Sequence, residues 1–327
     1  MFVLNILFVS AEEFRIGPSD SIQETIEKAM PGDTIHLEDG VYRESFETVR
    51  GGTAEEPITI KGGSDAVIKG DGHWRMIQVF HDHIHFKGFT VDGLHGDPDN
   101  QYAYTDKLIY VLGQEEKDGV DGFKLLNMTI KNSGGEAVRL RYYADDAEIA
   151  YSTFRNTGMH DFKFDDGGKN GEAIYIGTSS NQWDDGKNPE SGPDKSTGNW
   201  VHHNYFNTNG NECVDIKEGA RENIVEHNIC KGQEDPDSGG LDSRGNANVF
   251  RHNEVYNCEG AGVRLGGHDI NGKQYGKNNY VYGNEIHDNE YGAIKTMVAP
   301  QENICGNELN SNGDGYGNER LSPEEEC

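Results

Sequence analysis

The sequence predicts an all-β protein folded as a single-stranded parallel β-helix, a solenoid, with an N-terminal capping helix. The first observation is composition: the 327 residues include 43 glycines and are only 34% hydrophobic, which suits many short strands joined by turns better than a helical bundle. The second is a repeat of strand-length segments with a period of about 25 residues, which leaves no room for a helix in each repeat. The third is one amphipathic helical pattern near the N-terminus.

The repeat consists of a six-residue strand pattern followed by a second strand pattern that closes on asparagine. The six-residue segments are EAVRLR (136–141), EAIYIG (172–177), ECVDIK (212–217), GGLDSR (239–244), AGVRLG (261–266) and GAIKTM (292–297). The closing asparagines are Asn204, Asn228, Asn253, Asn284 and Asn307, and Asn127 resembles an earlier member. Because successive coils of a solenoid stack at ~4.8 Å, we expect these asparagines to form an internal ladder that satisfies buried backbone groups of the turn.

Alternation within each six-residue segment predicts which side chains face the core. Positions 3 and 5 are mostly apolar, as in Val138 and Leu140 or Val214 and Ile216, so they should point inward. Positions 2, 4 and 6 should then point outward. Side chains at one position should form a column along the solenoid, because equivalent strands lie directly above one another.

The N-terminal segment predicts a helix that covers the open end of the first coil. Residues 21–30 form an amphipathic pattern with Ser21 as the N-cap candidate, and Pro31 follows them. Such a helix would shield the edge of the first coil. Short strand patterns come next without a linker or a change in composition, so we expect one domain over residues 12–327.

Net charge and the chain's start narrow the classes of partner. A formal charge of −28 excludes general affinity for nucleic acid. The apolar start ends at Ala11 and resembles a secretory signal peptide over residues 1–11, so we expect a secreted, extracellular protein and a monomer. The sequence contains no run of ~18 apolar residues, so we expect no membrane span. Five cysteines are compatible with one or two disulfides and leave at least one cysteine unpaired.

The outward positions bring acids and bases together on one face of the solenoid. Position 4 holds Arg139, Tyr175, Asp215, Asp242, Arg264 and Lys295, position 6 includes Arg141, Lys217 and Arg244, and position 1 includes Glu136, Glu172 and Glu212. Lys217 and Arg244 should therefore be vertical neighbours, and so should Asp215 and Asp242. The alternative is that these are the solvated charges of an ordinary solenoid surface. Two basic columns beside paired aspartates favour a functional site.

These features resemble the pectate-lyase-type right-handed parallel β-helix superfamily, and most closely the chondroitinase B and alginate lyase type of polysaccharide lyase. In that family a glutamate opens a strand that ends in the catalytic lysine, and a catalytic arginine follows on the next coil. ECVDIK and GGLDSR match this pattern with Glu212, Lys217 and Arg244. One position departs, because the family has an acidic calcium ligand two residues before the glutamate, where this chain has Gly210. A second match, AGVRLGG, resembles the base-carrying strand of another pectate lyase family, with Arg264 in place of a lysine.

The resemblance implies a secreted lyase that cleaves a uronate-containing polysaccharide (pectate, alginate or a glycosaminoglycan) by calcium-assisted β-elimination. Such an enzyme removes the C5 proton beside a carboxylate, neutralises that carboxylate with Ca²⁺ or arginine, and expels the 4-O-glycosyl group. The expected residues are catalytic Lys217, Arg244 and Arg264, substrate-binding Arg139, Arg141, Tyr175 and Lys295, and calcium-binding Glu172, Glu212, Asp215 and Asp242. A lysine base needs a depressed pKa, which Arg244 would favour and Asp215 would oppose. Lys217, as an outward side chain, should contribute little to packing.

Two other functions stay open. A glycoside hydrolase on the same fold could use Asp215 and Asp242 as acid and base, although the neighbouring cations should keep both ionised. A non-catalytic, acidic, calcium-binding protein of the extracellular matrix would also suit the charge and the glycine at position 210. An insertion at 178–198 interrupts a coil beside the expected face, where Trp183 either contacts sugar or belongs to a solvated loop.

Overall fold

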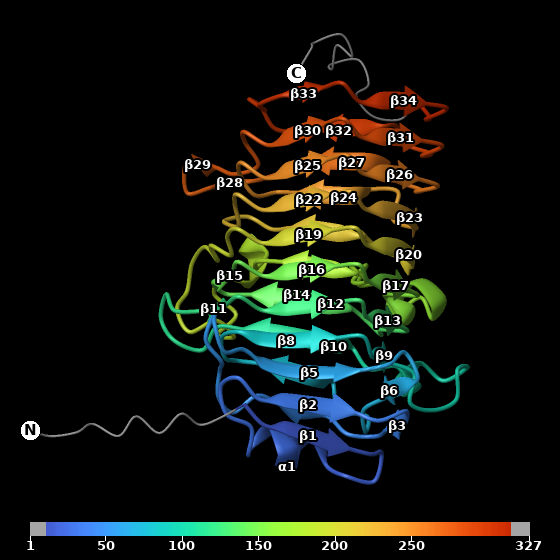
Figure 1. Ribbon diagram of the computed structural model, residues 1–327. Coiled ribbons are helices and arrows are strands. Elements are labelled where there is room, and N and C mark those ends of the chain that lie inside the picture. Colours follow the sequence, from blue (N-terminus) through green and yellow to red (C-terminus); the bar gives the residue numbers. More distant parts are fainter. Residues whose placement is uncertain (1–10, 315–327) are drawn as a thin grey trace, which may run out of the picture.

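The computed structural model describes residues 11–314, a chain wound into a stack of coils (Figure 1). A typical coil contributes one strand to each of three parallel sheets, visited in the order sheet 1, sheet 2, sheet 3. Equivalent strands pair in parallel with the coil before and the coil after. This part of the chain is all-β with long parallel sheets, consistent with a right-handed parallel β-helix, as the repeat predicts. Of the expected signal peptide, residues 1–10 lie outside the described residues.

The elements of the stack have the following bounds. Sheet 1 contains β1 (Glu13–Ile16), β2 (Thr34–Leu37), β5 (Ile58–Gly62), β8 (Ile84–Lys87), β12 (Lys124–Leu126), β16 (Glu148–Ala150), β19 (Trp200–His202), β22 (Ile224–Glu226), β25 (Val249–Arg251), β30 (Tyr280–Tyr282) and β33 (Ile304–Cys305). Sheet 2 contains β3 (Gly40–Tyr42), β6 (Ala66–Ile68), β9 (Thr90–Asp92), β13 (Thr129–Lys131), β17 (Thr153–Arg155), β20 (Tyr205–Gly210), β23 (Ile229–Gln233), β26 (Glu254–Tyr256), β31 (Glu285–His287) and β34 (Glu308–Asn310). Sheet 3 contains β4 (Phe46–Glu47), β7 (Arg75–Val79), β10 (Lys107–Leu112), β14 (Val138–Arg141), β18 (Ile174–Ile176), β21 (Val214–Ile216), β24 (Gly239–Ser243), β27 (Ala261–Leu265) and β32 (Ile294–Thr296). The connections hold the pairs β11 (Val120–Asp121) with β15 (Ala144–Asp145) and β28 (Asp269–Ile270) with β29 (Lys273–Gln274), besides α1 (Ile22–Ile26), η1 (Gln101–Ala103), η2 (Met159–Lys163) and η3 (Ser180–Gln182).

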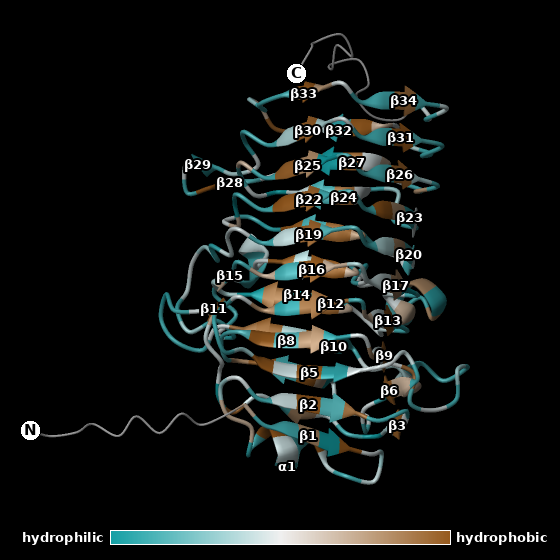
Figure 2. Cartoon of the chain, viewed as in Figure 1, coloured by the Kyte–Doolittle hydropathy of each residue, from teal (hydrophilic) through white to brown (hydrophobic). Residues whose placement is uncertain are grey.

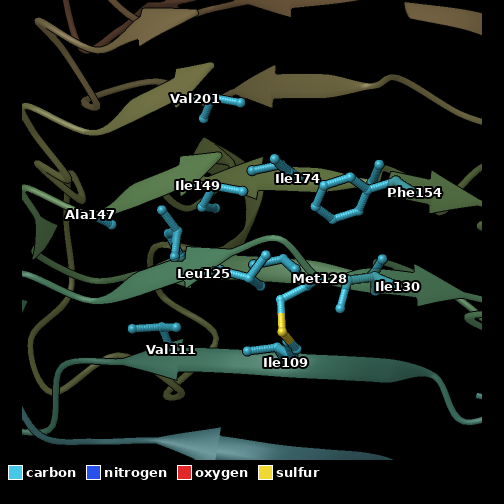
Figure 3. Packing of buried hydrophobic residues seen from close by; sticks show 14 of the residues in the cluster. Ile109, Val111, Leu125, Met128, Ile130, Ala147, Ile149, Phe154, Ile174 and Val201 are labelled. Atoms are coloured by element: carbon cyan, nitrogen blue, oxygen red, sulfur yellow. The ribbon is translucent and has the colours of Figure 1, made fainter. Parts of the chain in front are cut away.

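Columns of inward side chains fill the space between the sheets (Figure 3). Val138, Ile174 and Val214 occupy equivalent positions on β14, β18 and β21 and are fully buried, each contributing roughly 1.5–3 kcal/mol through burial. Brown apolar and teal polar residues accordingly mix along the strands in Figure 2. The prediction that position 2 points outward is wrong, because Ala137 and Ala173 lie in the core. The strands β14 and β18 begin only at position 3, so the alternation does not extend back through the preceding bend.

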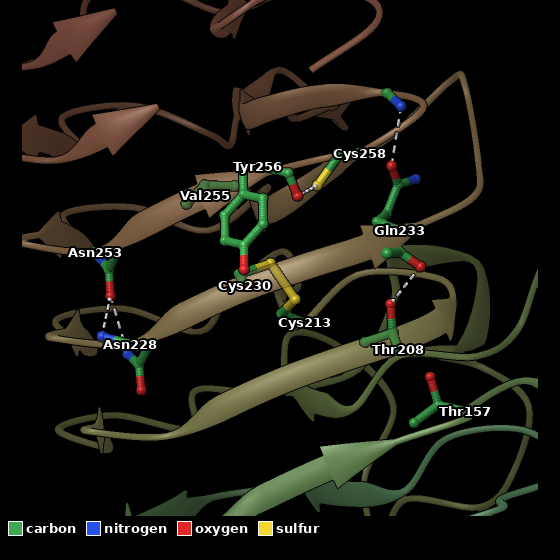
Figure 4. Close-up of a disulfide and its surroundings, with 12 residues drawn as sticks. Thr157, Thr208, Cys213, Asn228, Cys230, Gln233, Asn253, Val255, Tyr256 and Cys258 are labelled. Carbon is green, nitrogen blue, oxygen red and sulfur yellow. Dashed lines mark hydrogen bonds between the residues drawn. A yellow bond between two sulfur atoms is a disulfide. The ribbon is translucent and has the colours of Figure 1, made fainter. Parts of the chain in front are cut away.

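The predicted asparagine ladder is present. The backbone N–H of Asn204 donates to Asn228 Oδ1 at 2.9 Å, and that of Asn228 donates to Asn253 Oδ1 at 3.0 Å (Figure 4). Asn127 is not a member: it is exposed, with a positive φ of 56°. The position next to Asn204 is taken instead by Ser152, whose N–H donates to Asn204 Oδ1 at 2.9 Å. The prediction for Asn127 was therefore one residue out of register with the ladder.

The N-terminal helix begins where the sequence predicts and ends earlier. Ser21 is its N-cap, and the Ser21 hydroxyl accepts from the backbone N–H of Glu24 at 3.1 Å. Ile22 and Ile26 are buried, and the helix stops at Ile26 instead of reaching residue 30. Figure 1 places α1 beside β1 at the N-terminal end of the stack. Nowhere in residues 11–314 is there a helix with the length and apolarity needed to span a membrane.

A disulfide between two described residues links the connection from sheet 2 to sheet 3 with the next coil. Cys213, just before β21, is bonded to Cys230 in β23 (Figure 4). Cys258 is free and buried in the core. Both observations agree with the expectation of one or two disulfides and at least one unpaired cysteine.

Candidate active site

The outer face of sheet 3 carries the column that position 4 predicts. Tyr175, Asp215, Asp242 and Arg264 are aligned as Cα partners on β18, β21, β24 and β27 in turn. Because these strands stack directly, their outward side chains meet along the axis of the solenoid. The vertical pairing of Asp215 with Asp242 is confirmed.

Position 6 forms a second column in which small residues make room for large ones. The backbone N–H groups of Lys217 and Arg244 donate to carbonyls of the preceding coil at 2.8 and 2.7 Å, so the two residues are vertical neighbours. Gly177 precedes Lys217 in this column, and a Cβ built on it would lie 3.7 Å from the Lys217 Cβ. Gly266 follows Arg244, and its Cβ would lie 3.2 Å from the Arg244 Cγ. The flanking glycines leave space for the two cations.

Buried carboxylates converge between these columns. Glu172, Glu212 and Asp215 each offer an oxygen, and these oxygens lie within 4.8 Å of one another. Asp242 adjoins them on the next coil and is fully buried. Ser238, which the repeat did not single out, donates its hydroxyl to Glu212 and, at 3.2 Å, to Asp242. The acid–base cluster is defined here as Glu172, Glu212, Asp215, Lys217, Asp242, Arg244 and Arg264.

Lys217 lies inside this cluster and not on its surface. Its residue is 6% exposed, its ammonium contacts the Asp215 carboxylate, and Nζ lies 3.7 Å from Glu172 Oε1. Nζ also lies 4.4 Å from the centre of the Tyr175 ring. Burial by itself lowers the pKa of Lys217, but the charges of Asp215 and Glu172 outweigh burial and the opposing Arg244, and the pKa is raised. The depressed pKa that a lysine base needs is therefore not found here, and a side chain expected to contribute little to packing is buried against Asp215 and Tyr175.

Arg264 and Arg244 pair with different carboxylates. Arg264 contacts Asp242 through its guanidinium. Arg244 lies 3.5 Å from Glu218, a buried residue that also accepts from His268 Nδ1 at 2.5 Å. Sequence reasoning missed Glu218 and His268. Glu218 directly follows Lys217 in the sequence and could have been noticed there. His268 reaches the site from the connection after β27 and has no local signal.

The cluster contains more negative charge than its cations neutralise. Burial raises the pKa of Glu172 to about 7 and, together with the charges of Asp215 and Glu172, raises the pKa of Glu212 well above its usual range. Burial also raises the pKa of Asp242, although Arg264 and Arg244 act in the opposite direction. Burial thus acts on Asp242 against the cations that were expected to keep it ionised.

The unsatisfied atoms of the cluster fit a bound cation. Glu212 Oε2, Asp215 Oδ1 and Asp242 Oδ1 are buried without a hydrogen-bond partner, as is Asn211 Oδ1 beside them in sequence. Unpaired buried oxygens are costly, and a set made only of carboxylate and amide oxygens is the donor set that Ca²⁺ prefers. Three of the four predicted metal ligands, Glu172, Glu212 and Asp215, thus offer oxygens within 4.8 Å of one another, and Asp242 lies on the next coil.

Steric packing between coils explains why position 210 is a glycine. A Cβ built on Gly210, at the end of β20, would lie 2.1 Å from the backbone oxygen of Thr157. An aspartate or glutamate cannot occupy this position without moving the coil. The acid that the resemblance leads one to expect there is excluded by coil packing, and Glu172 and Asp215 supply oxygens close to Glu212 instead.

The insertion at 178–198 covers two of the predicted substrate-binding arginines. Arg141 is 1% exposed and donates to Asn188 Oδ1 at 2.5 Å and to Asp185 Oδ1 at 3.1 Å. Arg139 is 3% exposed and donates to Gln182 Oε1 at 2.7 Å. Both guanidinium groups anchor the insertion, so a direct substrate contact by Arg141 would require the insertion to move.

Trp183 is part of the same anchoring and is neither a sugar platform nor solvated. The residue is 7% exposed, its Nε1 donates to the carbonyl of Thr178 at 3.0 Å, and its ring packs edge-on against Tyr275. The expectation that Trp183 contacts sugar does not suit this buried ring, whereas most of residues 184–191 are exposed, as a solvated loop predicts.

Lys295 continues the position-4 column beyond Arg264. Its Nζ donates to the backbone oxygen of Asp237 at 3.3 Å. Burial and the neighbouring Arg264 charge lower the pKa of Lys295. It stands at the C-terminal side of the cluster, one coil beyond Arg264.

Comparisons with known proteins identify the fold. No family model matches the chain, and no curated protein matches it in sequence. Among solved structures, it is similar to alginate lyase from Paenibacillus sp. str. FPU-7, with a TM-score of 0.72 and 21% identity, over 92% of this chain and 99% of that one. It is also similar to pectate lyase Pel9A (TM-score 0.66, 11% identity, 97% and 82% covered) and to DFA-IIIase from Arthrobacter chlorophenolicus A6 (0.59, 14%, 94% and 86%). This chain has the pectate-lyase-like parallel β-helix fold.

Proposed function

We propose that this protein is a secreted polysaccharide lyase that cleaves a uronate-containing polysaccharide by calcium-assisted β-elimination. The observation that carries the proposal is the acid–base cluster, where Lys217 and Tyr175 lie in contact beside buried carboxylates and two arginines. These are the residue types that uronate elimination needs. Fold similarity to an alginate lyase and a pectate lyase supports the class of reaction.

The two proton transfers can be divided between neighbouring side chains. Lys217 takes the C5 proton, the electrons of that C–H bond form the C4–C5 double bond, and the C4–O bond breaks. Burial raises the pKa of Tyr175 despite the nearby cations, so this residue keeps its proton and can give it to the leaving oxygen. Base and acid thus adjoin on β21 and β18.

Charge on the substrate carboxylate is balanced by the rest of the cluster. Arg244 and Arg264 can pair with the carboxylate of the sugar, and Glu172, Glu212 and Asp215 would hold calcium. A Ca²⁺ ion bound there would stabilise the carbanion-like charge and would also draw the charge of the acids away from Lys217, which favours the neutral amine.

Secretion belongs to the same proposal. A polysaccharide is met outside the cell, and the apolar start of the sequence resembles a signal peptide. The Cys213–Cys230 disulfide supports an oxidising compartment.

A panel of polyuronates tests the proposal. Pectate, alginate and glycosaminoglycans are incubated with the protein, with Ca²⁺ or with chelator, while the ultraviolet absorbance of the unsaturated product and the reducing ends are both followed. We expect absorbance and reducing ends to rise together on one substrate, and only with calcium. Absence of unsaturated product on every polyuronate would contradict a lyase.

A glycoside hydrolase is the second candidate, and the raised pKa values of Asp242 and Glu212 favour it. A buried carboxylic acid that keeps its proton can serve as the general acid of glycoside cleavage. The same assay separates the two, because a hydrolase makes reducing ends without unsaturated product. Calcium binding without any cleavage would instead indicate a non-catalytic matrix protein.

A further inference from the structure

A second feature on sheet 3 lies toward the N-terminal end of the stack. Trp74, just before β7, is 76% exposed, an unusual position for so large an apolar ring. Trp74 and Arg75 line a hollow of about 400 Å³ together with Lys107, Tyr110 and Arg139. The same two residues line another hollow of about 690 Å³ over β4. The ring therefore stands over a grooved surface on the face that carries the acid–base cluster.

The charge of the first hollow is opposite to that of the whole protein. Its cations are Arg75, Lys107, Arg139, Arg141 and Lys187, against the carboxylates Asp106 and Glu136 of the lining and Asp185 beside it. Lys107 and Arg139 pair with the first two acids and Arg141 and Lys187 with Asp185, whereas Arg75 donates to the neutral Gln78 Oε1 at 3.3 Å. The formal charge of the chain is −28, so an excess of cations in one place is a local specialisation. Local positive potential of this kind attracts an anionic ligand.

Strand register places the hollow in line with the cluster, and the insertion at 178–198 lies between them over Arg139 and Arg141. Tyr110 is the Cα partner of Arg139, Arg139 of Tyr175, and Tyr175 of Asp215. From β21 to β7 there are four coil steps along sheet 3, about 19 Å at the spacing of parallel strands. One coil step is close to the length of one sugar ring in a polymer. A polysaccharide lying along this face from Lys217 would reach Trp74 after about four sugars.

We propose that the groove formed by Trp74, Arg75, Lys107 and Tyr110 is a distal subsite that binds the acidic polysaccharide about four sugars away from the bond that is cleaved. The Trp74 ring offers a flat apolar surface to the C–H face of a sugar. Arg75, whose guanidinium lies 3.9 Å from the centre of the Tyr110 ring, pairs with a uronate carboxylate, while Lys107, which is held by Asp106 and Glu136 at 2.5 and 2.7 Å, forms the wall of the groove. This inference rests on the proposed function for the identity of the ligand, and it adds dependence on chain length.

The test compares the wild-type protein and Trp74→Ala on oligogalacturonates and oligoalginates of increasing length. We expect kcat/KM of Trp74→Ala to fall about tenfold on chains long enough to span four coils, the equivalent of one lost aromatic contact. Shorter oligomers should be cleaved equally by both proteins. Arg75→Gln should show the same length dependence and a weaker salt dependence than the wild type.

Trp200→Ala is the matched control. Trp200 lies on β19 in sheet 1 and is 40% exposed, so its loss should leave the dependence on chain length unchanged. An equal loss for Trp74→Ala on short and long chains, or no loss on long chains, would overturn the subsite.

Calorimetric binding of the same oligomers separates this proposal from the lyase itself. Binding that strengthens with length and weakens in Trp74→Ala, but without cleavage, would refute the lyase and support the groove. If the oligomers are cleaved but bind equally well to the wild type and to Trp74→Ala, the distal subsite is refuted and the lyase is not. Absence of binding to every oligomer would refute both.

Discussion

Lys217 is buried, and its surroundings shift its pKa in opposite directions. Burial favours the neutral amine, whereas Asp215 in direct contact and Glu172 nearby favour the ammonium. The carboxylates outweigh burial, so the pKa of Lys217 is raised and the ammonium form is favoured. Removing the Lys217 ammonium leaves the fully buried Asp215 without its cation, and an unpaired buried charge strongly destabilises a protein.

Lys217→Met should therefore lose both activity and stability. We expect polyuronate cleavage to fall by roughly 10²–10⁴-fold, because a positioned base supplies about that factor, and Tm to fall in chelator. The double variant Lys217→Met/Asp215→Asn should regain much of the Tm and none of the activity. Activity is measured by the unsaturated product and Tm by calorimetry.

Lys295→Met is the control for this assignment, since Lys295 lies on the same face and has a lowered pKa. It should raise KM and leave kcat nearly unchanged. An inactive Lys295→Met beside an active Lys217→Met would transfer the role of base to Lys295.

At the scale of the elements, the asparagine ladder holds successive turns together. Asn228 accepts the N–H of Asn204 at 2.9 Å and donates its Nδ2 to the carbonyl of Val201 at 2.9 Å and to Asn253 Oδ1 at 3.0 Å. All of these groups belong to buried turns with little access to water. The side chain thus satisfies several backbone and amide groups at once.

Asn228→Ala should destabilise the protein more than the same change at the end of the ladder. Each buried group left without a partner costs about 1–3 kcal/mol, so we expect a loss of several kcal/mol in urea unfolding. Asn307→Ala is the comparison, because Asn307 is partly exposed and lies on the last described coil. Equal losses for the two variants would contradict the ladder as a source of stability.

The short pair β11 and β15 carries a pH-dependent charge. Burial, with the neighbouring Asp121 and Asp194, raises the pKa of Asp145 to about 6 from its usual 3.8. The folded state therefore binds this proton more tightly than the unfolded state. The stabilisation is fully present below about pH 4 and is lost as pH rises through about 6.

Asp145→Asn should raise Tm near pH 7.5 and have little effect near pH 4, where the wild-type carboxyl is already neutral. The amide oxygen can still accept the N–H of Thr197, which lies 2.6 Å from Asp145 Oδ1. Thermal unfolding at the two pH values measures the difference. Asp99→Asn, with a side chain 92% exposed, is the control and should change neither value. A Tm gain at pH 4 equal to that at pH 7.5 would argue against titration of Asp145.

At the scale of the whole molecule, the charge of −28 must be reconciled with an anionic ligand. Two features of sheet 3 do so: cations outnumber acids in the hollow beside Trp74, and the acid–base cluster has oxygens arranged for a divalent cation. Both lie on one face, along the direction in which strands stack. For the proposed function, this arrangement would let a long acidic chain approach along that face.

Calcium should stabilise the protein and be required for cleavage. At a concentration 100 times Kd, mass action adds roughly 2.7 kcal/mol to the free energy of unfolding, which appears as a rise in Tm over the protein in chelator. Glu212→Gln should reduce that rise, because one ligand oxygen loses its charge. Asp237→Asn is the control, since its exposed carboxylate pairs with Lys169 outside the cluster. An identical Tm in calcium and in chelator would leave Arg244 and Arg264 as the groups that neutralise the substrate.

The sequence determined the architecture because the determinants are periodic and local. The alternation of Val214 and Ile216 with Asp215 and Lys217 assigns a face to each side chain, and the repeat stacks each face into a column. This is sufficient to predict the parallel β-helix, the asparagine ladder and the gathering of Glu212 with Asp215 before any coordinates are known.

The tertiary structure alone decided how deeply the columns are buried and what covers them. The insertion folds back over Arg141, and His268 arrives from a distant connection to hold Glu218. The Thr157 carbonyl, from the coil before, excludes an acid at position 210. These contacts join residues far apart in the chain and leave no periodic trace in the sequence. Because a pKa depends on desolvation and on every charge nearby, the proton on Lys217 could be placed only after the fold had placed its neighbours.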